Sequence, residues 1–191
     1  MPILGVAASG ISGHLWAPGQ DYVSISTATV TSGGQATITF SSIPTTFTHL
    51  QIRCLANTDT STQDLLMRFN GDTAANYTTH MLYGQGASTT TYNETAQTSL
   101  RVGNAAGSTT ISNSYAASVI DIYDYLSTTK NKTFKALIGF DSNSTANVNY
   151  GGIFFQSGLW FKTPEAINSI SLTVSAGLLK QYSQLSLYGV K

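Results

Sequence analysis

The side chains best suited to act as nucleophiles, bases or metal ligands are Cys54 and three histidines, His14, His49 and His80. Nucleophilic catalysis needs a base beside Ser, Cys or Thr, and a metal site needs several ligands held together. The histidines are widely spaced and none belongs to a motif for either chemistry. Cys54 alternates with Ile52 in an apolar run, which favours a buried structural thiol. The sequence therefore predicts no catalytic residue, no cofactor and no metal ligand.

Carboxylates offer one alternative to this non-enzymatic interpretation. Hydrolysis of a glycosidic bond uses two carboxyl groups that flank the scissile bond. Asp121 and Asp124 lie close together in the sequence, but the whole chain has only nine acidic residues. Pairing of acids across a sheet is not visible in the sequence. A polysaccharide-degrading enzyme that uses these two acids therefore stays open as a third hypothesis.

The amino-acid composition is unusual, and it limits both the secondary structure that can position a site and the partners that the protein can bind. Charged residues make up only 9% of the 191 residues, and the net charge is zero. The nine basic residues are scattered singly, so no basic stripe is available for phosphates and nucleic acid is not an expected partner. No apolar run is long enough to span a membrane, and the N-terminus lacks the basic region of a secretory signal. Synthesis in a cytoplasm is therefore expected.

Short strands are predicted from the alternation of apolar and polar residues and from the many threonines. The first two strands, joined by a Ser-Gly-Gly turn, are expected to form a hairpin. Residues 77–83 fit either a strand or a short helix, and the Gly, Ser and Thr content of 84–97 predicts a long exposed loop. The predicted strands span 21–30, 35–40, 49–57, 63–69, 99–102, 117–125, 133–140, 148–155, 167–174 and 184–190.

Roughly ten short strands without an amphipathic helix indicate an all-β protein with a single antiparallel β-sandwich. Strand number and length favour a jelly-roll-like sandwich over an immunoglobulin-like one. The sandwich is expected to span residues 20–191. Residues 1–19 are predicted to form an extended N-terminal arm, because glycines and a proline interrupt their apolar residues.

The arm is the predicted partner-binding segment. Burying one of its large apolar side chains contributes about 2 kcal/mol, whereas ordering the backbone costs about 1 kcal/mol or more per residue. The arm is therefore expected to hold still only when it lies on a surface. A neighbouring subunit and the arm's own sandwich are equally open as that surface. The residues expected to make the contact are Ile3, Leu4, Val6, Ile11, Leu15 and Trp16.

Three tyrosines beside or within the Gly- and Ser-rich segments are candidate loop contacts. Tyr83, Tyr92 and Tyr115 could stack on sugar rings, because aromatic side chains in exposed segments often bind ligands. The alternative interpretation, in which they are ordinary core and rim aromatics of a sandwich, also stays open.

Several stretches resemble minor structural proteins of tailed bacteriophages. They are MPILGVAASGISG at 1–13, IPTTFTHLQIR at 43–53, LMRFNGDTAANY at 66–77 and SLYGV at 186–190. The resemblance implies a virion component and carries no catalytic residues with it. Its nearest fit is a cement, or decoration, protein that binds the major capsid protein on the outer capsid surface as a homo-oligomer, a trimer or dimer. A tail or fibre-associated module that binds host-surface carbohydrate is the alternative.

Overall fold

The computed structural model describes residues 21–107, 113–141 and 151–191, and within these ranges it contains strands and no helix. The all-β prediction is confirmed, while the predicted arm lies outside the described residues. The strands are β1 (Tyr22–Thr29), β2 (Thr37–Phe40), β3 (His49–Ala56), β4 (Gln63–Phe69), β5 (Tyr77–Gln85), β6 (Ser88–Gln97), β7 (Leu100–Ala105), β8 (Ala116–Ile122), β9 (Lys132–Phe140), β10 (Gly152–Trp160), β11 (Ile170–Val174) and β12 (Gln184–Val190).

The strands form two antiparallel sheets that pack as a β-sandwich, as predicted. The large sheet has the order β1-β12-β3-β8-β9-β10-β5-β6, and the small sheet has the order β2-β11-β4-β7. Consecutive strands lie in different sheets throughout the chain, except at β5 to β6, β8 to β9 and β9 to β10, which stay within the large sheet. The hairpins β5–β6 and β9–β10 both belong to the large sheet, which is therefore wider than the small one.

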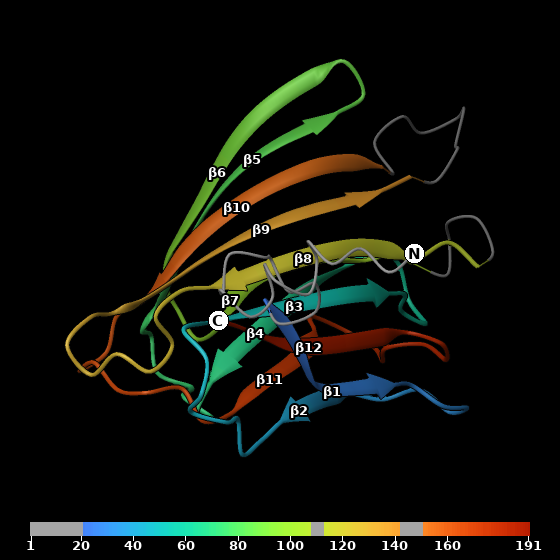
Figure 1. Ribbon diagram of the computed structural model, residues 1–191. Helices are drawn as coiled ribbons and strands as arrows, with labels where there is room; N and C mark the ends of the chain where they lie inside the picture. Colours follow the sequence, from blue (N-terminus) through green and yellow to red (C-terminus); the bar gives the residue numbers. More distant parts are fainter. Residues whose placement is uncertain (1–20, 108–112, 142–150) are drawn as a thin grey trace, which may run out of the picture.

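The extra width leaves part of the large sheet uncovered on its inner side. Figure 1 shows β9, β10, β5 and β6 rising away from the small sheet towards the turn of the β5–β6 hairpin. At their other end these strands converge on the small sheet, and Tyr77 and Trp160 there are buried. The strand of the small sheet that meets them is its edge strand β7, which contacts β8, β9, β10 and β5. One pair of strands, β5 and β10, thus has a sealed end and an open end.

The core lies between the sheets and follows the predicted alternation. In β3, Leu50, Ile52, Cys54 and Ala56 point inwards and are at most 4% exposed, as the sequence predicted. Burial raises the pKa of the Cys54 thiol to about 12. Because the thiolate is the reactive form of cysteine, this thiol is inert at neutral pH and serves as an apolar core group.

An aromatic cluster closes the sealed end of β5 and β10. Trp160 lies 5.4 Å from Phe69 and 6.3 Å from Tyr77 between ring centroids, and all three side chains are buried. The Trp160 indole donates a 2.7 Å hydrogen bond to Asp72 in the turn after β4. That turn depends on positive φ angles at Asn70 and Gly71, as the Asn-Gly step predicted.

Close packing at this end also requires a glycine in β10. A Cβ atom added at Gly158 would lie 2.3 Å from a ring carbon of Phe134 and from the carbonyl oxygen of Thr78. Neither atom has room to move, because Phe134 is buried and the Thr78 carbonyl belongs to the neighbouring strand.

Two predictions of local structure are wrong. The predicted first hairpin does not form, because β1 pairs with β12 and β2 pairs with β11 in the other sheet. Strand pairing over long sequence distances replaces the short connection that the turn residues suggested. The predicted loop at 84–97 is instead the end of β5 and the whole of β6. Its composition is polar because β6 is an exposed edge strand, and threonine suits such a strand.

The ambiguous segment 77–83 is a strand, part of β5. The strand predicted at 148–155 is β10, which continues to Trp160, while residues 148–150 lie outside the described ranges. The helical alternative for 77–83 fails because Tyr77, Thr79 and Met81 alternate with more exposed residues at a period of two.

Candidate binding surfaces

The outer side of the large sheet, which faces away from the small sheet, carries large apolar side chains that are unusually exposed. Their exposed fractions run from 40% for Val119 to 67% for Ile153. Single exposed apolar residues are ordinary, whereas a contiguous set marks a contact surface. The set, called here the outer apolar face, consists of Leu55, Leu82, Val119, Leu137, Ile153 and Phe155.

Strand register places these side chains next to one another. Phe155 of β10 pairs with Leu82 of β5 on one side and Leu137 of β9 on the other. Leu137 in turn pairs with Val119 of β8, which completes a row across four strands. A second row runs alongside through Ile153, Gly139, Ala117 and Leu55. The outer apolar face is therefore continuous across five neighbouring strands.

A groove of about 590 Å³ follows part of this face, and a cationic residue, Arg53, is among the residues that line it. The guanidinium of Arg53 lies 4.7 Å from the Tyr188 ring centroid and 5.3 Å from that of Tyr22.

A second candidate surface is a cleft on the inner side, at the open end of β5 and β10. It has a volume of about 340 Å³ and lies between the large sheet and a wall formed by β7 and by Thr62, which precedes β4. The residues that line it, called here the inner cleft, are Thr62, Met81, Tyr83, Gln85, Tyr92, Arg101, Asn104, Phe140 and Phe154.

Aromatic rings form one wall of the inner cleft. Tyr83, Phe154 and Phe140 lie in a row across β5, β10 and β9, with centroid separations of 5.5 Å and 6.0 Å and interplanar angles of 20° and 1°. Tyr92 of β6 is 48% exposed, and its hydroxyl bonds Glu94 at 3.3 Å. The row holds Tyr83 in place, whereas the Tyr92 ring remains accessible.

Polar groups form the opposite wall. Arg101 of β7 makes a 2.6 Å ion pair with Asp64 of β4, and the Asn104 side-chain amide lies 3.4 Å from the same carboxylate. Burial raises the pKa of Asp64, Arg101 opposes this rise and the nearby Glu94 adds to it. Asn104 is 6% exposed, and among the described residues its Oδ1 atom has no hydrogen-bond partner.

The structure brings together two of the three tyrosines that the sequence singled out. Tyr83 and Tyr92 both line the inner cleft, but from strands rather than from loops. Tyr115 does not line it, and its hydroxyl donates a 2.8 Å hydrogen bond to the Gln181 carbonyl oxygen. The arm residues Ile3, Leu4, Val6, Ile11, Leu15 and Trp16 lie outside the described residues.

The two acids of the hydrolase hypothesis have separate partners. Asp121 accepts a 2.8 Å hydrogen bond from Gln51, while Asp124 pairs with Lys130 at 2.7 Å. The hydrogen bond from Lys130 holds the pKa of Asp124 below its usual range. A general acid needs the opposite shift, so this environment does not favour Asp124 in that role.

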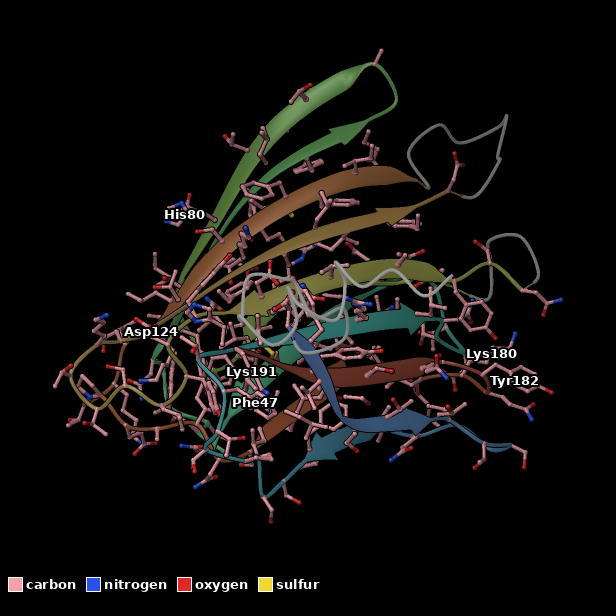
Figure 2. All side chains as sticks on the ribbon, viewed as in Figure 1. Phe47, His80, Asp124, Lys180, Tyr182 and Lys191 are labelled. Atoms are coloured by element: carbon pink, nitrogen blue, oxygen red, sulfur yellow. The ribbon has the colours of Figure 1, made fainter. Side chains whose placement is uncertain are left out.

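The histidines that lie within the described residues, His49 and His80, occupy the strands β3 and β5. His49 accepts a 3.0 Å hydrogen bond from the Asp124 amide and lies edge-on to the Tyr123 ring. Figure 2 shows His80 on β5 and Asp124 in the segment that follows β8. In the described ranges, no three His, Cys, Asp or Glu side chains are grouped so as to hold a metal ion.

The residues that sequence reasoning missed are those of the opposite cleft wall and the outer apolar face. Arg101 and Asn104 belong to β7, which follows β6 directly in the sequence but lies in the other sheet. The alternation of residues in β10 shows that Ile153 and Phe155 lie on one face of the strand. It does not show that no second layer covers this face.

No helix that is long and apolar enough to cross a membrane occurs in the part of the chain that the structure describes. Comparison with protein-family models, with curated proteins and with solved structures finds no match to this chain. The resemblance to bacteriophage structural proteins is therefore unsupported by these comparisons and stays a prediction.

Proposed function

We propose that this protein is a non-enzymatic virion component that binds and stabilises an assembled phage capsid. The observation that carries the proposal is the outer apolar face, with six large side chains exposed on five adjacent strands. Soluble monomers seldom expose contiguous apolar area of this kind, and it usually marks an interface. A low charge and a net charge of zero also suit a protein that works inside an assembly.

The proposed occupant of the outer apolar face is the major capsid protein. Two features support a protein surface as the occupant. Arg53 is the one charged residue among those that line the groove, and two further charges on the same side of the sheet, Lys135 and Asp121, form an ion pair of 3.8 Å. We propose that the apolar arm and the outer apolar face both contact the capsid, with edges of the sandwich completing the interface.

We infer further that the sandwich is a jelly roll with two added hairpins. In an eight-stranded jelly roll, two Greek keys give two four-stranded sheets that the chain enters alternately. The segment β1-β12-β3-β8 opposite β2-β11-β4-β7 fits that order, and β5–β6 and β9–β10 then extend one sheet. Jelly rolls recur in viral capsid proteins, which adds support to a place on the outer capsid surface after synthesis in the host cytoplasm. We propose a homo-oligomer, a trimer or dimer, as the bound form.

Binding of purified protein to undecorated phage heads tests the proposal. The double variant Leu137→Asp/Phe155→Asp puts two charges in the centre of the outer apolar face, and we expect it to lose binding. Tyr182→Asp is the matched control, because Tyr182 is 69% exposed, lies in the segment before β12 (Figure 2) and is not among the residues that line the groove. Co-sedimentation with heads measures the effect. Equal binding by the double variant and the wild type would contradict the proposal.

The alternative, a tail or fibre-associated module that binds host-surface carbohydrate, draws its support from the inner cleft. Aromatic rings and hydrogen-bonding groups face each other there. The two proposals use different sides of the large sheet, so they do not exclude each other.

A further inference from the structure

We propose that the inner cleft binds a neutral saccharide through the Tyr92 and Tyr83 rings and the polar side chains of Arg101 and Asn104. This proposal concerns the isolated chain and does not rest on attachment to a capsid. It draws on the geometry of the open end of β5 and β10, where the small sheet leaves aromatic side chains uncovered.

The aromatic wall suits the apolar face of a sugar ring. Flat rings contribute large contact area at little cost in conformational entropy. Tyr92 is 48% exposed although it lies opposite Met81 on the inner side of the hairpin. Tyr83 is fixed by stacking on Phe154, which is itself stacked on Phe140. The wall is therefore formed before a ligand arrives, and binding needs little rearrangement.

The polar wall suits sugar hydroxyl groups. Arg101 and Asn104 line the cleft, while Asp64, which is not among the lining residues, holds the Arg101 guanidinium in place through an ion pair of 2.6 Å. A guanidinium carries several N–H donors, so neighbouring hydroxyls of a sugar can accept hydrogen bonds from it. Arg101 Nε and Asn104 Oδ1 are shielded from solvent and have no partner among the described residues. A buried polar atom without a partner costs stability. A small shift of either side chain on binding would let a sugar hydroxyl supply the missing hydrogen bond.

The charges around the cleft favour a neutral sugar over an acidic one. Asp64 and Glu94 are close enough to affect each other, and only Arg101 balances them among the groups that act on Asp64. A phosphate, sulfate or uronate would find the guanidinium of Arg101, the one charged residue among those that line the cleft, already paired with the Asp64 carboxylate. The cleft volume of about 340 Å³ falls at the lower end of the usual range for small-molecule sites, about 300–1,000 Å³. This size fits a short glycan segment.

The test is a binding screen of the full chain against immobilised neutral, amino and acidic oligosaccharides. The strongest neutral binder is then titrated by calorimetry, and amide chemical shifts are followed by NMR. We expect neutral glycans to bind more tightly than their acidic counterparts. We expect the largest shifts at Tyr83, Tyr92, Arg101 and Asn104.

Two substitutions at one exposed position separate stacking from a general loss of structure. Tyr92→Ala removes the ring and is expected to weaken binding about tenfold, the size of one aromatic contact. Tyr92→Phe keeps the ring and is expected to retain most of the affinity. Tyr182→Ala, far from the cleft in sequence and not among its lining residues, is expected to change nothing.

The proposal fails if no neutral glycan in the screen binds the wild type more tightly than Tyr92→Ala. It also fails if the NMR shifts of a bound glycan map to the outer apolar face instead of the inner cleft. Tighter binding of acidic glycans than of neutral ones would overturn the assignment of ligand class.

Discussion

The two ends of β5 and β10 carry similar side chains on the same inner face but differ in what covers them. At the sealed end, Tyr77 and Trp160 pack with Phe69 of the small sheet and are fully buried. At the open end, Tyr83 and Phe154 stack in the same way but line a cleft. The position of the second sheet, and not residue type, decides which aromatic group serves the core and which is available to a ligand.

The largest expected effect comes from removing the central ring of the sealed end. Trp160→Ala leaves a cavity among Phe69, Tyr77 and Asp72, and we expect it to lower the free energy of unfolding by about 3–5 kcal/mol. Urea denaturation followed by circular dichroism measures this. Tyr92→Ala, at the open end, is the matched comparison, with an expected change of about 0.5 kcal/mol or less. Equal losses for the two variants would mean that the open end belongs to the core.

The second largest effect is expected in the loss of stability at acid pH, to which Asp72 at the sealed end contributes. Burial raises the pKa of Asp72, but hydrogen bonds from Asn76, Trp160 and the Ala74 amide outweigh it and hold the pKa below its usual value. A lowered pKa in the folded state stabilises the protein above the ordinary Asp pKa of about 3.9. That contribution is lost as the pH falls through the lower, folded-state pKa. Unfolding free energies between about pH 6 and pH 2 should therefore drop less steeply for Asp72→Asn than for the wild type.

The contribution of Asp64, at the open end, to stability should depend on pH in the opposite direction to that of Asp72. Its pKa is raised by burial, so its contribution to stability is present below about pH 3.9 and is lost as the pH rises through the folded-state pKa. The unfolding free energy of Asp64→Asn over the same pH range therefore provides the contrast, because this variant lacks the contribution that the wild type loses as the pH rises. A steeper loss in acid for Asp72→Asn than for the wild type would contradict the assigned contacts.

The smallest effect on stability is expected on the outer apolar face. Ile153→Thr and Leu82→Thr replace exposed side chains with a residue that suits strands, so each should change the unfolding free energy by about 0.5 kcal/mol or less. The same variants should lower the fluorescence of a dye that binds exposed apolar surface. Unchanged dye fluorescence would show that the face is covered in the free protein.

The fold could be predicted where the signal was local. The alternation of Leu50, Ile52, Cys54 and Ala56 identified a core strand, and the Asn70-Gly71 step identified a turn. Two features could not be read because they depend on which strands pair with each other. The strand β1 pairs with β12 and not with β2, and the polar segment at 84–97 is a strand only because β5 lies beside it.

The candidate sites were predicted only in part for the same reason. Tyr83 and Tyr92 stand out as aromatic residues in a polar segment, and the structure brings them to one cleft. Arg101 and Asn104 carry no such signal, because only the approach of β7 from the other sheet brings them opposite the tyrosines. The outer apolar face is a property of the whole sheet, since its members come from five strands.

The most direct test of the proposed function is the position of the chain in purified virus particles, determined by electron cryomicroscopy of the phage to which the proposal assigns it. We predict copies distributed over the outside of the head, with Leu137 and Phe155 turned towards the capsid and Tyr92 turned away from it. Density confined to the tail, or a head-bound chain whose outer apolar face points to solvent, would contradict the account.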